Sequence, residues 1–375
     1  MYIYEQPDWP NFKWDKDIIN SKLIVVNKAV GFLMGRLSAI GFDSQMTAVV
    51  DAVAHDIIAS CEIEGVELNN NQVRSSIARK LGIELPNSIS SSRYIDGIVE
   101  MALDATINYS SPISDKRLFG WHNLLFPTGW SGSVKIDVAS YRKGEMKVVS
   151  GMFGREKVHY ITPPAESVAK EMSHFIEWFN TDSNPSYLKS AIAHLWFVCI
   201  HPFDDGNGRI GRAIADMALS QAENSKMRFF SISNQINKDK KRYYSILEKT
   251  QKGNCDITDW LTWYLECMLR SIKQAETILR QVLNKAIFWQ NHASISLTER
   301  QTNIINLYLD GYQAKLTIKN WAKKAKVSQD TAARDIKSLI QKNILIPQQG
   351  KVRDAHYGIV CNESTVVIPM PQGED

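Results

Sequence analysis

Chemically capable side chains are concentrated in one short segment near the middle of the chain. Between His201 and Arg212 the sequence places an imidazole, two carboxylates, an amide, two guanidiniums and several glycines. Guanidiniums form bidentate hydrogen bonds with phosphate oxygens, and carboxylates bind hard metal ions. An imidazole can accept or donate a proton near neutral pH. The segment therefore indicates an active site that handles phosphate.

Two apolar stretches with helical spacing flank this segment. One runs from Leu188 to Ile200 and stops before a proline, and the other runs from Ile210 to Ala222. The polar segment is therefore predicted to be a loop between two helices. The first turn of the second helix leaves backbone N–H groups unpaired, with the positive end of the helix dipole toward the loop. We expect an anion to bind there.

His201 and Asp205 suggest proton transfer and metal binding. The unperturbed pKa of a histidine, about 6.5, suits the removal of a proton from a hydroxyl nucleophile. Asp205 offers the hard oxygen ligand that Mg²⁺ prefers, and this ion usually takes one or two carboxylates together with phosphate oxygens. Asp204 has no comparable assignment, and its simplest role is to orient a neighbour.

The remaining polar groups of the segment are hydrogen-bond donors. Gly206, Asn207 and Gly208 would supply backbone and amide N–H groups to a phosphoryl group. Arg209 and Arg212 are three residues apart, so they share a helix face and can both bind phosphate oxygens. A structural histidine or an ordinary Gly-Asn-Gly turn would explain one part of the segment but not the whole set.

The segment resembles the motif of the Fic (filamentation induced by cyclic AMP) family, His-Pro-Phe-x-(Asp/Glu)-Gly-Asn-Gly-Arg-x-x-Arg, at every position. The resemblance implies a helical core that transfers AMP from ATP to a hydroxyl of a target protein. It implies His201 as the base and Asp205 as the Mg²⁺ ligand. It also implies nucleotide contacts from Asp205, Gly206, Asn207, Gly208, Arg209, Ile210, Gly211 and Arg212. Some relatives transfer other nucleotides or phosphate groups, so the motif defines the phosphate chemistry more closely than the group transferred.

A second candidate site lies far upstream of this motif. Apolar spacing predicts a helix from Asp43 to Glu64 that ends at Gly65, with Ser60 and Glu64 one turn apart. Alone, these two would be surface residues. The segment 60–65 resembles the inhibitory pattern (Ser/Thr)-x-x-x-Glu-(Gly/Asn) of many Fic proteins. That resemblance implies that Glu64 pairs with Arg212 and blocks productive binding of ATP; in some relatives the same glutamate helps to remove AMP.

Two short β-prone runs precede the motif. Lys147 to Ser150 and Val158 to Ile161 are separated by a glycine-containing turn and predict a hairpin. In Fic proteins a hairpin flap borders the nucleotide and pairs with the backbone of the target. By this resemblance the flap residues Val158, His159, Tyr160 and Ile161 lie at the nucleotide. His159 is interpreted as an ordinary strand residue rather than a catalytic one.

A pair of aromatic residues follows the motif. Tyr243 and Tyr244 lie in a helical pattern, where paired tyrosines can pack in a core. The Fic family has an aromatic pair at this place beside the nucleotide, where ring faces and hydroxyls suit a base and a ribose. Gln251 stands where some relatives have asparagine, which weakens the expected preference for ATP.

The whole chain is large enough for more than one domain. At 375 residues it divides into three expected regions, 1–112, 113–286 and 294–375, which are an N-terminal helical domain, a Fic catalytic domain and a winged helix-turn-helix domain. We see no apolar run of transmembrane length and no signal peptide, which predicts a cytoplasmic protein without a membrane partner. Five cysteines without a Cys-x-x-Cys pair fit a reduced compartment without zinc.

The third region has the element order of a winged helix. Helices are predicted over Thr298–Leu309, Thr317–Ala325 and Ser328–Lys342, followed by a strand pair over Leu345–Ile359. Between residues 315 and 353 ten Lys or Arg stand against two Asp, while the chain totals +4, so the positive charge is local. Helix 328–342 could enter a DNA major groove. A docking or dimerisation module with a solvated basic face is an equal alternative.

The sequence as a whole predicts a mainly α protein with a small β-hairpin flap. The leading hypothesis is an autoinhibited, Mg²⁺-dependent protein adenylyltransferase that acts on Ser, Thr or Tyr hydroxyls of target proteins or of the protein itself, with ATP as substrate. Alternatives are a DNA-binding regulator whose Fic core senses nucleotide, and a Fic enzyme that transfers another nucleotide or removes AMP. Family members often form dimers, so a homodimer is a further expectation.

Overall fold

The computed structural model describes residues 1–37, 42–85, 88–151, 155, 157–182, 186–310, 312, 314–348 and 356–360. The chain forms two compact units, Met1–Ala275 and Glu276–Asp375. Helices dominate both units, and the named strands of the described residues form three two-stranded antiparallel pairs. The prediction of a mainly α protein with a hairpin before the motif is confirmed.

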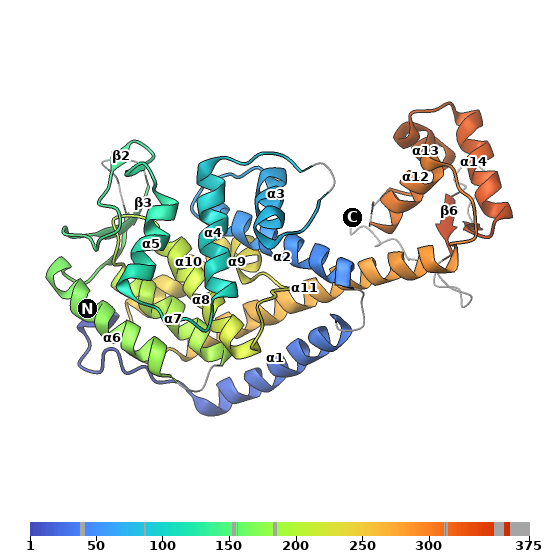
Figure 1. Ribbon diagram of the computed structural model, residues 1–375. Helices are drawn as coiled ribbons and strands as arrows, with labels where there is room; N and C mark the ends of the chain where they lie inside the picture. Colours follow the sequence, from blue (N-terminus) through green and yellow to red (C-terminus); the bar gives the residue numbers. More distant parts are fainter. Residues whose placement is uncertain are drawn as a thin grey trace. The chain divides into compact units, whose positions relative to one another are not determined.

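The first unit consists of helices and two strand pairs (Figure 1). The helices are η1 (Ile3–Glu5), α1 (Lys16–Leu37), α2 (Phe42–Ile63), α3 (Asn70–Leu81), α4 (Arg93–Ile107), α5 (Asp115–Leu125), α6 (Ala165–Thr181), α7 (Tyr187–Ile200), α8 (Asn207–Glu223), α9 (Ile232–Lys238) and α10 (Lys240–Gln251). The long helix α11 (Thr258–Asn291) begins in this unit and ends in the second. The strands are β1 (Trp130–Ser131), β2 (Val134–Lys135), β3 (Lys147–Ser150) and β4 (Lys157–Ile161).

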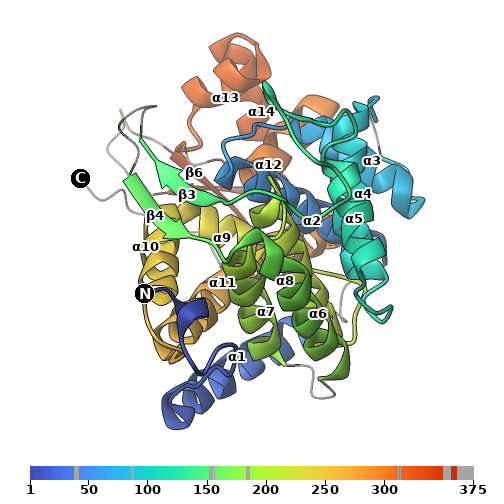
Figure 2. The same ribbon diagram turned by 90° about the vertical axis from the view of Figure 1, so that its left-hand side faces the viewer.

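Helices α7 and α8 form the centre of this unit (Figure 2). Helix α7 packs on α6, and α8 packs on α4, α5 and α2. Nearly every residue of α7 is buried, as expected for a helix that is apolar on all sides. The segment between α7 and α8, which carries the polar cluster, is therefore fixed at both ends by the core.

Helix α1 is apolar along most of its length. Its 22 residues are long and apolar enough to cross a membrane by length and composition alone, with a mean hydropathy of 1.3 over 18 residues. The expectation that the chain has no such run was therefore wrong, because Lys22 and Lys28 interrupt the run without removing its apolar character. The helix also has a place in the folded unit, because Ile19, Val26 and Leu33 are buried and Lys22 pairs with Glu266 of α11 at 2.9 Å.

The second unit has three helices followed by a strand pair. These are α12 (Glu299–Leu309), α13 (Ile318–Ala325), α14 (Gln329–Gln341), β5 (Leu345–Gln348) and β6 (His356–Ile359). Thr298, Thr317 and Ser328 cap the three helices through their side-chain oxygens. The elements predicted from the sequence are thus present, although residues 349–355, with Gly350, lie outside the described ones. DNA binding by this unit, and the three domain boundaries, stay predictions.

Candidate active site

The turn between α7 and α8 places the polar cluster at the start of a helix. His201 ends α7 in the left-handed region with φ 54°, and Gly206 precedes α8 with φ 83°. A side chain at Gly206 would be strained there and would also meet the ring of Phe126. Helix α8 begins at Asn207, three residues earlier than predicted, so the second half of the expected loop is the first turn of the helix.

His201 is held as a neutral base. Its Nδ1 lies 3.2 Å from the carbonyl oxygen of Val198. Since a carbonyl only accepts, this pairing puts the proton on Nδ1 and leaves the lone pair on Nε2. Burial lowers the pKa of His201 to about 4, and the positive charge of Arg142 acts in the same direction. The imidazole is therefore ready to take a proton at neutral pH.

The low pKa of His201 is open to direct measurement. We expect the ring to titrate with a midpoint near pH 4 in ¹H–¹⁵N NMR spectra of the folded protein. Because unfolded histidine takes its proton at about pH 6.5, folding stability should decrease as the pH falls from that value toward 4. In Glu64→Gly the midpoint should be lower still, since the Glu64 charge raises the pKa of His201. A midpoint near 6.5 in the native protein would contradict this assignment.

The two carboxylates of the loop have different surroundings. Asp204 Oδ2 accepts a hydrogen bond from the backbone of Asp137 at 2.9 Å, which orients a neighbouring segment. Asp205 accepts from the Ser131 hydroxyl of β1 and from the backbone of Gly206, and 42% of its side chain is exposed. The described residues contain no cluster of three or more potential metal ligands. A single accessible carboxylate nevertheless fits a Mg²⁺ ion that takes its other ligands from phosphate and water.

Asn207 closes the loop instead of pointing its amide at a ligand. Its Oδ1 accepts from the backbone N–H of Phe203 at 2.9 Å, and its Nδ2 donates to the Phe203 carbonyl at 2.7 Å. The ring of Phe203 in turn stacks on His122 with centroids 4.3 Å apart. The expected amide donor is therefore used within the loop. The donors that remain for an anion at this end are the backbone N–H groups in the first turn of α8.

Arg209 is buried beside the loop. Its Nη1 donates to the Tyr94 hydroxyl of α4 at 3.1 Å, and its guanidinium lies over the ring of Phe126. Its Nη2 is 3.7 Å from Asp205 Oδ2. Arg209 thus sets a positive charge beside the proposed metal ligand.

Arg212, at the end of the motif, forms its hydrogen bonds with the C-terminal end of α2 and the turn after it. Arg212 Nε donates to the Ser60 hydroxyl, while Nη2 donates to the Ser60 carbonyl and to Glu64 Oε1, each at 2.8 Å. A side chain at Gly208 would collide with the Glu64 carboxylate. The carboxylate therefore lies against the first turn of α8, the end of a helix at which anions are generally stabilised. The structure thus shows the expected contact of Ser60 and Glu64 with Arg212 of the motif.

Two residues between the arginines face away from the loop. Ile210 is fully buried in the core, and a side chain at Gly211 would press on Val198 and Phe197 of α7. These two positions were expected among the nucleotide contacts; the structure shows that they pack α8 on α7, and a contact of their main chain with a nucleotide stays a prediction. The reason is helical geometry, because Arg209 and Arg212 occupy one face of the turn and the positions between them point elsewhere.

Several contacts besides Arg212 hold the end of α2, which begins at Phe42, close to the predicted Asp43. Asp56 accepts from the hydroxyls of Ser231 and Ser233 at the start of α9, at 2.6 and 3.2 Å. Farther along, Glu62 accepts from Asn237 at 2.7 Å. The helix ends at Ile63, one residue earlier than predicted, and Gly65, with φ 78°, lies in the turn that follows. Glu64 is thus held in the turn directly after a firmly packed helix.

The flap residues are divided between solvent and core. In the β3–β4 pair, Val158 is exposed, whereas Tyr160 is fully buried and donates its hydroxyl to the Cys199 carbonyl at 2.9 Å. Ile161 is half-buried and pairs with Lys147. His159 binds both Ser150 of β3 and Glu248 of α10. The flap is thereby attached to α10, a link that strand periodicity does not predict.

The two tyrosines of α10 have different environments. Tyr243 is buried against Trp260 and Trp263, and its hydroxyl lies 3.0 Å from His194 Nε2. Tyr244 is 40% exposed, and its hydroxyl donates to the Ile63 carbonyl at 3.4 Å. Tyr243 therefore belongs to the core. Of these two tyrosines, Tyr244 is the one whose ring is accessible to a nucleotide base.

Arg142 is a site residue that sequence reasoning did not assign. It is 3% exposed, and its guanidinium donates to the carbonyls of His201, Gly144 and Pro163 at 2.8, 2.8 and 2.6 Å. The side chain therefore joins the motif loop to the segments on both sides of the flap. A single arginine in a polar stretch gives no local signal of such a role.

Replacing Arg142 with alanine should destabilise the protein. Hydrogen bonds to a charged group contribute about 1.5–3 kcal/mol each, so we expect the free energy of unfolding to fall by about 3 kcal/mol or more. Urea unfolding followed by circular dichroism measures this change. Arg93→Ala, at an exposed position of α4, is the control and should change little. Equal effects of the two substitutions would contradict the role of Arg142.

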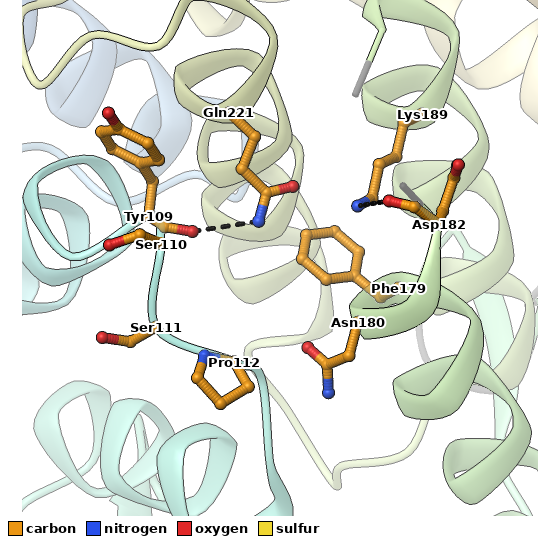
Figure 3. A pocket seen from close by; sticks show the side chains of 9 residues that line it. All are labelled: Tyr109, Ser110, Ser111, Pro112, Phe179, Asn180, Asp182, Lys189 and Gln221. Carbon is orange, nitrogen blue, oxygen red and sulfur yellow. Dashed lines mark hydrogen bonds between the residues drawn. The ribbon is translucent and has the colours of Figure 1, made fainter. Parts of the chain in front are cut away.

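A separate pocket of about 270 Å³ lies at the ends of α6, α7 and α8 (Figure 3). Gln221 there donates to the Tyr109 carbonyl at 3.0 Å, and the buried Lys189 donates weakly to the Asp182 carbonyl at 3.4 Å. None of the residues predicted for the active site lines this pocket. It is therefore not the site of the motif chemistry.

Comparison with known proteins agrees with the fold and the motif. Residues 112–219 match the Fic/DOC family, and residues 2–83 match a domain of unknown function, DUF4172. The structure is similar to that of a Fic family protein from Desulfovibrio desulfuricans, with a TM-score of 0.51 and 20% identity over 90% of this chain and 95% of that chain. The chain therefore contains a Fic/DOC family domain with the Fic fold.

Part of the chain is also similar to several proteins named as nucleotidyltransferases. The chain is 29% identical over 233 residues to the protein adenylyltransferase Fic of Nematostella vectensis. This alignment covers 60% of this chain and 49% of that protein. It is 28% identical over 123 residues to a probable protein adenylyltransferase of Aquifex aeolicus, covering 32% and 34%. It is 29% identical over 119 residues to a uridine 5'-monophosphate transferase of Xanthomonas campestris, covering 30% and 22%. The chain thus spans about half or less of the length of each of these relatives.

Proposed function

We propose that this protein is an autoinhibited adenylyltransferase that transfers AMP from ATP to a Ser, Thr or Tyr hydroxyl of target proteins. The observation that carries the proposal is the Glu64 carboxylate, which lies on Arg212 and against the first turn of α8. A phosphate group of ATP needs the same guanidinium and the same helix end. The adenylyltransferases among the relatives support AMP as the transferred group.

His201 would start the reaction. Its Nε2 lone pair accepts the proton of the target hydroxyl, and the oxygen attacks the α-phosphorus of ATP while the bond to pyrophosphate breaks. The low pKa of His201 keeps this lone pair available at neutral pH. Because Arg142 fixes the backbone of the loop, the imidazole need not move to reach the hydroxyl.

The phosphates would be held by the start of α8 and by the two arginines. Arg209 is already in place, whereas Arg212 becomes available when Glu64 leaves it. Asp205, with its accessible carboxylate, would hold Mg²⁺, which when bound neutralises phosphate charge. In the inhibited state the Glu64 charge repels a phosphate from this place, so any ATP that binds has its phosphates displaced.

The transferred group is tested by intact-mass spectrometry. Glu64→Gly protein incubated with Mg²⁺ and either ATP or UTP, alone and with cell lysate, should show AMP on protein in the ATP sample. Transfer from UTP in preference would replace the proposal with uridylylation, which one relative performs. Release of AMP from a modified target by the native protein would show that the Glu64 site also works in reverse.

A second candidate function is DNA binding by the second unit. The basic residues of the segment 315–353 include Arg334 and Lys337, which are exposed on α14. A regulator of this kind would use the Fic core to sense nucleotide. It is supported if labelled duplex DNA is retained by the His201→Ala protein, with affinity that falls steeply with salt, while no nucleotide transfer occurs even with Glu64 replaced.

A further inference from the structure

The pocket at the ends of α6, α7 and α8 contains a buried positive charge (Figure 3). Lys189 is 4% exposed, and its ammonium makes one hydrogen bond to the described residues, at 3.4 Å to the Asp182 carbonyl. The ammonium also lies 4.6 Å from the centre of the Phe179 ring. Because an ammonium carries three donors, Lys189 has hydrogen-bonding capacity for a further partner.

The charge of Lys189 is only partly balanced by the protein. Burial lowers the pKa of Lys189, and the Asp182 carboxylate, which acts in the opposite direction, has a smaller effect. A buried ammonium costs free energy unless an anion pairs with it. The pocket therefore favours a ligand with a negative charge.

Gln221 presents a buried acceptor to the same pocket. Its Nε2 donates to the Tyr109 carbonyl at 3.0 Å, whereas its Oε1 is buried without a hydrogen-bond partner among the described residues. Figure 3 shows the Gln221 amide and the Lys189 ammonium pointing toward the space beside the Phe179 ring. Buried polar atoms are nearly always paired in folded proteins, because an unpaired one costs free energy. A group that offers an acceptor to Lys189 and a donor to Gln221 would satisfy both side chains.

Hydrogen bonds hold the wall of the pocket in place. Asn180, at the end of α6, binds the backbone N–H and carbonyl of Ile113 at 2.9 and 2.8 Å. Arg117 of α5 donates to the Ser111 carbonyl at 2.6 Å. The segment 109–112 is thereby attached to α5 and α6, in addition to its bond from Gln221. The pocket is formed by the fold itself, as is usual for binding sites of small molecules.

The pocket is well separated from the motif. Lys189 lies in the first turn of α7, and His201 follows the last turn of the same helix. At a rise of about 1.5 Å per residue, their backbones are about 18 Å apart. A ligand in this pocket would therefore not compete with ATP at the motif.

We propose that this pocket binds a small carboxylate that carries an N–H or O–H group next to the carboxylate, as α-amino and α-hydroxy acids do. The carboxylate accepts hydrogen bonds from Lys189, and the adjacent N–H or O–H donates to Gln221 Oε1. One ammonium balances one negative charge, which favours a carboxylate over a phosphate, whose charge is nearer −2. The cavity of about 270 Å³ has room for a molecule of this size.

L-lactate and propionate form a matched pair of probes, because they differ only in the hydroxyl group next to the carboxylate. L-alanine places an ammonium group at the same position. We expect at least one of L-lactate and L-alanine to bind about tenfold more tightly than propionate, because propionate leaves the Gln221 oxygen buried without a donor. The side-chain amide signals of Gln221 in ¹H–¹⁵N NMR spectra of the full chain report binding at this pocket, and their absence in Gln221→Glu assigns them.

Variants of the two polar side chains test their roles. Lys189→Met keeps the length of the side chain and should weaken binding at least tenfold, since hydrogen bonds from a charged donor are the strong ones. Gln221→Glu should also abolish binding, observed through the NMR signals of the probe, because its carboxylate would pair with Lys189 in place of the ligand. Lys170→Met, at an exposed position of α6, should bind like the native protein. Thermal unfolding verifies that each variant is folded.

The contrary outcomes are distinct. If no probe shifts the Gln221 signals, the pocket holds water only and the inference is overturned. Equal binding of propionate, L-lactate and L-alanine would overturn the role of Gln221, and tighter binding of inorganic phosphate than of every carboxylate would overturn the class of ligand. Displacement of the bound probe by ATP would overturn the separation from the motif. None of these results bears on AMP transfer, so the proposed function is tested independently.

Discussion

Replacing Glu64 with glycine should raise AMP incorporation into target proteins about tenfold to a hundredfold. The substitution removes a hydrogen bond between charged groups, which contributes about 1.5–3 kcal/mol, and each 1.4 kcal/mol corresponds to a factor of ten. It also frees the first turn of α8, because the Glu64 carboxylate lies against Gly208. Incorporation from ATP labelled at its α-phosphate measures the gain.

The matched control for this prediction is Glu62→Gly. Glu62 lies in the last turn of α2, two residues before Glu64, and accepts a hydrogen bond from Asn237, but it forms no hydrogen bond or ion pair with Arg212. Its replacement introduces the same flexible residue and should leave incorporation near the native level. An equal gain in both variants would mean that loosening of α2, rather than loss of the Glu64 carboxylate, activates the protein. Unchanged or lower incorporation in a folded Glu64→Gly protein would count against inhibition altogether.

Replacing His201 with alanine in the activated Glu64→Gly protein should reduce AMP transfer to added target proteins by a factor of about 10²–10⁴, the usual contribution of a general base. The backbone of the loop should keep its shape, because Arg142 and Asn207 hold it through main-chain atoms. Binding of ATP, measured by calorimetry, should therefore change little while the transfer rate falls.

The exposed His174 of α6 provides the control for His201. His174→Ala should retain full transfer, since the residue lies on the surface and takes no part in the described site. Transfer by the His201→Ala protein at more than about a tenth of the activated rate would identify another base for the target hydroxyl. The prediction would then fail, even with inhibition by Glu64 intact.

The elements of the site could be predicted because their signals are local. The apolar run of α7, the stop at His201 and the glycines before α8 are readable in the chain. The pair Glu64 and Arg212 was found by resemblance, and the structure places them 2.8 Å apart. The boundary of α8 was missed because Asn207 and Gly208 are weak helix formers that tertiary contacts bring into the first turn.

Other parts of the site have no signal in the sequence. Arg142 binds carbonyl oxygens, which every residue has, so no pairing pattern reveals it. The contact of His159 with Glu248 joins residues 89 apart through the packing of β4 on α10. Tyr243 became a core residue because neighbouring tryptophans cover it, and their positions depend on the fold.

The hydrogen bonds between α9 and α2 bear on how the proposed inhibition could be relieved. Asp56 and Glu62 keep α2 in place by contacts that do not involve Arg212. Loss of the Glu64 contact therefore leaves the helix seated. On the proposed mechanism, activation would therefore need a new rotamer of the Glu64 side chain rather than a movement of α2.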